Sequence, residues 1–340
     1  MRKHATVLTA LLLCCLFLLA PGCSRHDGKS QHYRLLYSIF FPSTHIHSKL
    51  AREWADEIER RTEGRVKIDI YCGSLLSSAG DNYECVVNGV SDLGMSCFSY
   101  SRGMFPMIEG LDLPWGYTSG SQATRIANKF IEEFHPAELD ETEIMYVHAH
   151  GPGVLASKRP VPDLATLGTL SVRGTGITAQ VVRSLGANPI GLSQGDTYEA
   201  LRKGVVEGTL CPMETLKGWR QGEVIEHITT IPAIGYTTAM FVTMNKKTWA
   251  SLPQDIREII LQANKEWQDK HGLAWDQADQ EGLAFVTSLG RTCADFPPEE
   301  NAKAAAKLKP LLSNWADNLE KKGLPGHRAL EFLQQEIAKP

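Results

Sequence analysis

Apolar and polar positions along the first third of the chain follow the periods of strands and helices in turn. Apolar runs of strand length lie at 33–41, 66–71 and 93–98. Segments with apolar residues at helical spacing lie between them, at about 48–62 and 79–88. This β-α-β-α-β order predicts a parallel sheet with helices on its faces.

The second part of the chain repeats this plan. After a predicted helix at about 121–134 and a strand at 144–150, further strands are expected at 170–173, 189–192 and just before Pro212, with helices at 178–185 and 197–203. The segments GVVEGTLCP (204–212) and GVSDLGMSC (89–97) share a pattern, in which Gly-Val-x-Glu or Gly-Val-x-Asp follows a predicted helix and precedes a predicted strand. Two lobes built to one plan are the simplest explanation.

The last hundred residues predict a strand and long helices. The strand is expected at 238–244, one long helix at about 254–289, and a further helix at about 299–323. We expect the strand and the long helix to cross back between the lobes. Lobe I then comprises 33–150 plus about 239–278, and lobe II comprises 151–238 plus about 279–335. A chain of 340 residues has room for both lobes.

Charge and cysteine usage exclude several classes of partner. The net charge is −4 and no basic stripe occurs, so nucleic acid is not expected as a partner. Five cysteines follow Cys23, no C-x-x-C occurs, and neither a disulfide scaffold nor a zinc site is supported. His45 and His47 have a spacing that could suit a metal, but no acidic or cysteine partner lies nearby, so we expect no metal and no cofactor.

The N-terminus predicts export. A basic start at Arg2 to His4 precedes an apolar run at 5–20, which is short for a membrane-spanning helix. We therefore expect a signal peptide over 1–23 and a polar tether over 24–32. Because 19–23 (LAPGC) also resembles a bacterial lipobox, Cys23 is a candidate for lipidation, although a plain cleaved signal remains an alternative. Either outcome places the protein in the periplasm, in the first case anchored to a membrane by its lipid.

The segment TLSVRGTGITAQVV (169–182) has the outline of a dinucleotide-binding turn. Gly174-x-Gly176-x-x-Ala179 follows a predicted strand, and an acid, Asp196, comes 20 residues after Gly176. However, the segment lies mid-chain in an exported protein, and Gly195-Asp196-Thr197 is typical of a helix N-terminus. We therefore expect no nucleotide here.

The same turn can instead bind an anion. Arg173 ends the strand, at the edge where open α/β sheets bind ligands. Gly174 and Thr175 add backbone N–H groups before a helix N-terminus, which favours negative charge. The guanidinium can hold a carboxylate through two hydrogen bonds. The alternative is a solvated surface arginine.

Several longer segments carry a family resemblance. WADEIERRTEGRVKIDIY, GVSDLGMSCFSYSRGMFPMIEGLDLPW, LGANPIGLSQGDTYEALRKGVVEGTLCP and MNKKTWASLPQDIREII resemble the extracytoplasmic solute receptors of tripartite ATP-independent periplasmic (TRAP) transporters, and the likeness covers most of 33–330. It implies a two-lobed α/β periplasmic-binding-protein fold, each lobe a mixed sheet flanked by helices, with a long helix spanning both. It also implies a receptor, presumed here to be monomeric, that delivers an organic acid to a membrane permease, with Arg173 at the position of the carboxylate-binding arginine.

The departures from the family pattern bear on the ligand. Gly153 stands where many members have a second cleft arginine, and Cys211 stands where receptors for sialic-acid-type ligands have asparagine. Further candidate ligand contacts on the lobe I side are apolar or aromatic: Phe40, Phe41, Cys97, Phe98 and Tyr100. Because a sugar acid needs many hydrogen bonds, we expect a monocarboxylate with an apolar or aromatic body. A C4-dicarboxylate or a sugar acid is the alternative.

Other candidates lie on loops expected to face the cleft. Gln194, Met213 and Glu214 could contact polar groups of the ligand, and Glu214 could instead hold Arg173 or meet a ligand amine. Trp219 and Tyr236 could form walls. Because neighbouring residues of a strand face opposite sides, only one of Phe40 and Phe41 is expected to face the cleft. His148 and His150 are interpreted as a hydrogen-bonded junction of the lobes.

A secreted two-lobed enzyme is the distant alternative to a receptor. No H-E-x-x-H motif and no Walker-type glycine run occurs in the sequence. Together with the family resemblance, this favours a binding protein without catalytic activity, which closes its lobes around the ligand.

Overall fold

The computed structural model describes residues 31–339. The predicted signal peptide, Cys23 and nearly all of the predicted tether lie outside this range. Within it, no helix combines the length and the apolar character that crossing a membrane requires. The five cysteines in this range, at 72, 85, 97, 211 and 293, are all free thiols.

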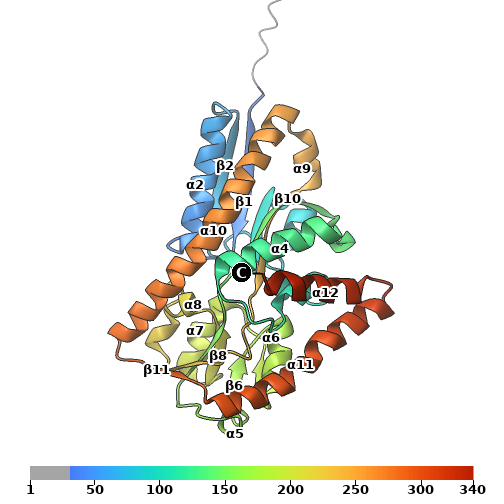
Figure 1. Ribbon diagram of the computed structural model, residues 1–340. Helices are drawn as coiled ribbons and strands as arrows, with labels where there is room; N and C mark the ends of the chain where they lie inside the picture. Colours follow the sequence, from blue (N-terminus) through green and yellow to red (C-terminus); the bar gives the residue numbers. More distant parts are fainter. Residues whose placement is uncertain (1–30, 340) are drawn as a thin grey trace, which may run out of the picture. The chain divides into compact units, whose positions relative to one another are not determined.

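Lobe I is built on a five-stranded sheet with the order β2-β1-β3-β10-β4 (Figure 1). Its strands are β1 (Tyr33–Ile39), β2 (Val66–Tyr71), β3 (Leu93–Cys97), β4 (Thr142–Ala149) and β10 (Ala239–Asn245). The pairs β1–β2 and β1–β3 are parallel, as the sequence predicted, and β10 runs antiparallel to both β3 and β4. Its helices are α2 (Ile46–Arg61), α3 (Asn82–Val87), α4 (Gly120–Phe134) and α9 (Lys246–Ser251).

Lobe II is built on a six-stranded sheet with the order β11-β9-β5-β8-β6-β7. Its strands are β5 (Val154–Ser157), β6 (Ser171–Arg173), β7 (Asn188–Ile190), β8 (Gly208–Cys211), β9 (His227–Thr230) and β11 (Thr292–Asp295). Strand β6 is parallel to β7 and β8, whereas β5 is antiparallel to β8 and β9. Its helices are α5 (Leu164–Leu167), α6 (Gly176–Ser184), α7 (Gln194–Lys203) and α8 (Met213–Gly218).

One long helix, α10 (Gln254–Ser288), runs past both sheets (Figure 1). It packs on α2, α4 and β4 of lobe I and on α8 of lobe II. Two of its aspartates accept from helix N-termini, one in each lobe. Asp276 accepts from the backbone N–H of Gly120 in α4 at 2.6 Å, and Asp279 accepts from that of Glu214 in α8 at 2.7 Å. The helix therefore fixes the starts of α4 and α8 through hydrogen bonds as well as packing.

The chain ends in two helices, where the sequence predicted one. The first, α11 (Pro298–Lys321), packs on α6, and α12 (Gly326–Ile337) packs back on α4. The predicted mixed sheets, flanking helices and spanning helix are all present. The pattern missed strands β5, β9 and β11, each of only four residues.

Candidate ligand-binding site

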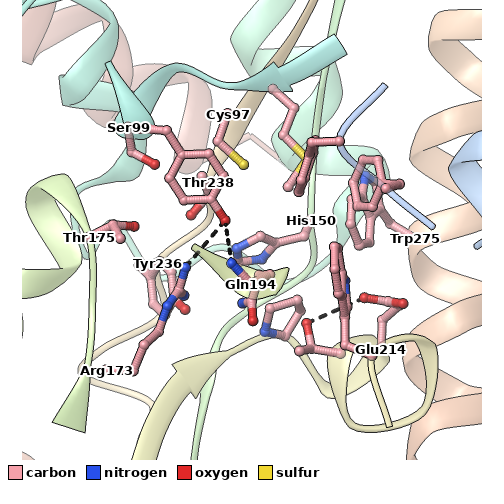
Figure 2. Close-up of a pocket in the computed structure, with 17 residues that line it drawn as sticks. Cys97, Ser99, His150, Arg173, Thr175, Gln194, Glu214, Tyr236, Thr238 and Trp275 are labelled. Carbon is pink, nitrogen blue, oxygen red and sulfur yellow. Dashed lines mark hydrogen bonds between the residues drawn. The ribbon is translucent and has the colours of Figure 1, made fainter. Parts of the chain in front are cut away.

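A narrow pocket lies between the two lobes (Figure 2). Lobe I lines it with the segment after β1, the end of β3 and the ends of β4 and β10. Lobe II lines it with the β6–α6 turn, the start of α7 and the segment around α8. The lining residues are Phe40, Phe41, Cys97, Ser99, Tyr100, His150, Arg173, Thr175, Gln194, Pro212, Glu214, Thr215, Trp219, Tyr236, Thr238, Met240 and Trp275.

Arg173 is the buried cation of this pocket, with 5% of its surface exposed. Its Nε donates to the carbonyl of Leu192 at 2.9 Å, and Nη1 approaches the carbonyl of Leu210 at 3.4 Å. Nη2 donates to the hydroxyl of Tyr100 at 3.3 Å. A guanidinium has five N–H donors, so two remain, and no carboxylate of the described chain pairs with it. A buried charge with only neutral partners is costly, and an anion would compensate it.

The turn after Arg173 starts a helix as the sequence predicted. Thr175 is the N-cap of α6 and forms a reciprocal capping box with Thr178, whose hydroxyl accepts from the Thr175 N–H at 2.8 Å. Gly176 has a φ of +51°, and a Cβ there would lie 3.0 Å from the Cβ of Ser99 in lobe I. The glycine therefore serves the turn and the close approach of the lobes. Asp196 lies in the first turn of α7, where its carboxylate accepts from the hydroxyl of Ser193 at 2.6 Å.

Tyr100 of lobe I contacts two residues of lobe II at the pocket. Its hydroxyl oxygen accepts from Nη2 of Arg173 and from the backbone N–H of Gln194 at 3.0 Å. Burial raises the pKa of Tyr100, so the hydroxyl keeps its proton at neutral pH. With both lone pairs engaged, the O–H is left to donate, either to the neighbouring sulfur of Cys97 or to a ligand oxygen beside Arg173.

The opposite side of the pocket is aromatic. The ring of Phe40 stacks on that of Trp219 across the lobes, with a centroid distance of 5.8 Å and an interplanar angle of 24°. Phe41 contacts Phe40 at 4.0 Å and His45 at 4.2 Å between ring centroids. The expectation that only one phenylalanine faces the cleft was wrong. Strand β1 ends at Ile39, and the alternation of a strand no longer holds in the bend that follows.

Tyr236 fills the space next to Gly153. A Cβ on Gly153 would lie 1.9 Å from Cε1 of Tyr236, and the Gly153 N–H donates to the Tyr236 carbonyl at 3.1 Å. Tyr236 is almost fully buried and lines the pocket. A larger residue at position 153 is therefore incompatible with this ring position.

Glu214 pairs with His45 and not with Arg173. The two side chains are buried, and Nε2 of His45 lies 2.8 Å from Oε1 of Glu214. Nδ1 of His45 accepts from the N–H of His47 at 3.3 Å, so the ring proton is on Nε2, the nitrogen that lies near the carboxylate. The pair connects the N-terminus of α2 in lobe I to that of α8 in lobe II.

Four of the predicted contacts lie outside the pocket lining. Phe98 packs edge-to-face against Phe105 and Phe241 in the core. Cys211 is buried in β8, and Met213 packs against the hydrophobic core of lobe II. Gly174 donates its N–H to the carbonyl of Ile190 at 3.1 Å.

The structure adds lining residues that the pattern did not identify. They are Ser99, His150, Pro212, Thr215, Thr238, Met240 and Trp275. His150 was interpreted only as a lobe junction, and Trp275 lies on α10, far from the other lining residues in sequence. The only local signal that could have identified His150 is its position directly after the end of a strand.

Three further imidazoles lie close together beneath the pocket. Nitrogens of His47, His148 and His271 lie within 4.8 Å of one another, all buried. The Nδ1 atoms of His47 and His271 are 2.7 Å apart, so one donates and the other accepts. Burial lowers the pKa of all three rings, that of His271 to about 3. The cluster is therefore uncharged at neutral pH.

Trp275 also contacts this cluster. It donates its indole N–H to Nδ1 of His148 at 3.1 Å, which puts the proton of His148 on Nε2. Nε2 of His47 and Nε2 of His148 are buried without a hydrogen-bond partner among the described residues. The expectation of no metal stays a prediction.

Asp279 predicts a pH dependence of stability. Burial raises its pKa from an ordinary value of 3.8 to about 7. The hydrogen bond from the Glu214 N–H lowers this pKa, whereas the Glu214 carboxylate raises it. Because the folded pKa is the higher one, the stability that this group contributes is complete at low pH and is lost as pH rises through about 7.

We expect Asp279→Asn to gain stability relative to the wild type at high pH. Asparagine can still accept from the Glu214 N–H but never carries the buried charge. Between about pH 5 and about pH 8.5, the difference in unfolding free energy should move in favour of the variant by roughly 2–4 kcal/mol. Denaturant titrations at both pH values measure it, and parallel curves for the two proteins would contradict the assignment.

The comparisons with known proteins identify the family. Residues 37–318 match the family model described as bacterial extracellular solute-binding protein, family 7. A TRAP periplasmic solute-binding protein from Desulfovibrio salexigens is 27% identical with a TM-score of 0.79, over 90% of this chain and 95% of that one. One from Rhodoferax ferrireducens, with copurified benzoate, is 24% identical with a TM-score of 0.85, over 90% and 97%. One from Bordetella bronchiseptica, with (R)- and (S)-mandelate, is 24% identical with a TM-score of 0.83, over 89% and 98%.

The chain belongs to this family of bacterial extracellular solute-binding proteins and is a TRAP-type extracytoplasmic solute receptor. This confirms the predicted family, the two-lobed fold and the class of receptor rather than enzyme. The fold alone does not define the ligand, since the Chromohalobacter salexigens protein of this fold has bound d-glucuronate.

Proposed function

We propose that this receptor captures a monocarboxylic acid with an aromatic or apolar body and delivers it to a TRAP permease. The observation that carries the proposal is Arg173, a buried guanidinium with two spare N–H donors and no carboxylate partner in the described chain. A ligand carboxylate can accept both N–H groups as a fork and a third hydrogen bond from the Tyr100 hydroxyl. Thr175 and the amide of Gln194 lie beside this clamp.

The surroundings of Arg173 favour a single carboxylate. Arg173 is the one lysine or arginine among the described residues that line the pocket. At Gly153, where the family resemblance implies a second arginine in many members, the ring of Tyr236 occupies the adjacent space. A second carboxylate would have no cation to meet, and Glu214 would repel it.

The aromatic side of the pocket supports the choice of ligand body. Phe40, Phe41 and Trp219 offer ring faces, and Tyr236 and Trp275 complete the wall. Aromatic pairs gain about 0.5–1.5 kcal/mol beyond the burial of their area, whereas each buried sugar hydroxyl left unpaired costs about 1–3 kcal/mol. Aryl, indole and branched keto acids fit this lining better than sugar acids.

Ligand capture is proposed to proceed by closure of the lobes. Residues 33–150 with about 239–278 would move against 151–238 with about 279–335. The contacts that closure would form are those of Tyr100 with Arg173 and Gln194, and the Phe40–Trp219 stack. The closed monomer would then dock on its permease.

Export and anchoring complete the proposal. A signal peptide with a lipobox over 1–23 would deliver the receptor to the periplasm. Cleavage before Cys23 and lipidation of that residue would tether the receptor to the membrane through 24–32. Mass spectrometry of the N-terminus of the exported protein separates a diacylglyceryl cysteine from a plain cleaved end.

A thermal-shift screen tests the function. We expect benzoate, phenylacetate and indole-3-acetate to raise the melting temperature, and benzamide, which lacks the charge, to do so far less. An acid at 100 times its Kd should stabilise the protein by about 2.7 kcal/mol. Succinate and glucuronate serve as the contrasting acids. If they stabilise the protein and the aromatic acids do not, the proposed ligand class is wrong.

A further inference from the structure

His150 presents a defined tautomer to the pocket. It follows directly on β4, and its backbone carbonyl accepts from the hydroxyl of Thr237 at 2.5 Å. Its Nδ1 lies 2.5 Å from the carbonyl oxygen of Gly151. Because a carbonyl can only accept, Nδ1 carries the proton and Nε2 is left with a lone pair.

The free nitrogen belongs to the ligand pocket. His150 is 2% exposed and lines the pocket with Arg173, Tyr236 and Thr238 (Figure 2). The side-chain hydrogen bond of His150 among the described residues is that of Nδ1 with Gly151, and Nε2 takes no part in it. Burial lowers the pKa of His150 to about 4. The bond to Gly151 raises this pKa, and the Arg173 charge lowers it. The ring is therefore neutral at pH 7, and Nε2 is an acceptor.

A carboxylate alone leaves this acceptor without a partner. Carboxylate oxygens accept hydrogen bonds, so they can satisfy Arg173 and Tyr100 but not Nε2 of His150. The Ser99 hydroxyl, 5% exposed as a residue, is a second lining group with no hydrogen-bond partner. A ligand ammonium would be repelled, because His150 lies close enough to Arg173 to be influenced by its charge. A neutral donor suits the position.

We propose that the native acid carries, besides its carboxylate, a neutral hydrogen-bond donor, a hydroxyl or a ring N–H, that donates to Nε2 of His150. This rests on the proposed function, since it places the carboxylate on Arg173. His150 is then a specificity-determining residue, which selects acids that have such a donor over those that lack it. An unpaired buried acceptor weakens binding, so the acid without the donor should bind about tenfold or more weakly.

Calorimetry on matched pairs of acids tests the proposal. The pairs are mandelate with phenylacetate, 3-hydroxybenzoate with benzoate, and indole-3-acetate with 1-naphthylacetate. The first acid of each pair carries the donor, at a different position in each case. We expect the donor-bearing acid of at least one pair to bind the wild-type receptor about tenfold or more tightly. Equal affinities within all three pairs would overturn the role of His150 and leave the carboxylate receptor intact. Failure of every acid to bind would overturn the proposed function itself.

Two variants assign the preference to this nitrogen. His150→Phe keeps a ring against Tyr236, which it now meets edge-to-face at 5.3 Å, but has no acceptor. It should bind the donor-free acid more tightly than the wild type does, because no acceptor is left unpaired, and it should lose the preference within the pair. His150→Gln, which keeps an acceptor on a side chain of similar reach, should restore part of it. Binding of the donor-free acid reports that each variant is folded, and an unchanged preference in His150→Phe contradicts the proposal.

Discussion

Arg173→Ala is expected to weaken the binding of carboxylic acids by about 100-fold or more. Removing one partner of a buried, hydrogen-bonded charge pair costs about 2–5 kcal/mol, because the other charge is left buried and unpaired. In this pocket no other described lysine or arginine could replace the guanidinium. The loss should therefore be large for every acid in the screen, and largely independent of the rest of the ligand.

Arg173→Lys should recover only part of the affinity. An ammonium keeps the charge but not the planar fork, nor the separate bonds to Leu192 and Leu210 that hold the guanidinium in place. Arg183→Ala is the matched control, because Arg183 lies exposed on α6, the helix that follows the same turn. Isothermal titration calorimetry with one aromatic acid compares the four proteins. Wild-type affinity in Arg173→Ala would show that the carboxylate binds elsewhere.

Gly153→Ala is expected to impair ligand binding by a purely steric route. The backbone of Gly153 requires no positive φ, but an added methyl would lie 1.9 Å from the ring of Tyr236. The ring is buried and lines the pocket, so moving it takes space from the ligand. We expect a loss of about 1–3 kcal/mol in unfolding free energy, as in other overpacked cores, and at least about tenfold in affinity.

Two further variants make this prediction specific. Gly80→Ala is the control, because the nearest atom to its added methyl lies at 3.8 Å. Combining Gly153→Ala with Tyr236→Leu removes the clashing ring and should recover most of the lost stability. Denaturant unfolding and calorimetry give the two quantities separately. If Gly153→Ala behaves like Gly80→Ala in both, Tyr236 does not restrict position 153 in solution.

Long or fully buried elements could be predicted from pattern alone. The helix expected at 254–289 is α10, Gln254–Ser288, and the strand expected at 238–244 is β10, Ala239–Asn245. Every residue of β10 is buried, so its apolar run is continuous. Strands β5, β9 and β11, of four residues each, were missed, whereas the shorter strands β6 and β7 were found because a predicted helix follows each of them. The extended state of the missed strands depends on pairing with one another and with β8, which no local pattern records.

The same division holds for the candidate site. The β6–α6 turn, its glycine, its cap and Arg173 lie within a few residues of one another, so their arrangement is local and could be inferred from the sequence. Phe40 and Phe41 were found for the same reason, although their common orientation was not, because it depends on where β1 ends. Trp275 could not be found, since only the path of α10 across both lobes brings it to the pocket.

Backbone propensity, helix capping and the spacing of buried residues act over a few residues, and they already specified the β-α units and the turn that carries Arg173. Folding decided the rest, because the deciding contacts join residues far apart in the chain. Tyr100 meets Gln194, His45 meets Glu214, and Tyr236 closes the space beside Gly153. These contacts leave Arg173 buried without a counter-charge, and the proposed binding of a single carboxylate rests on that arrangement.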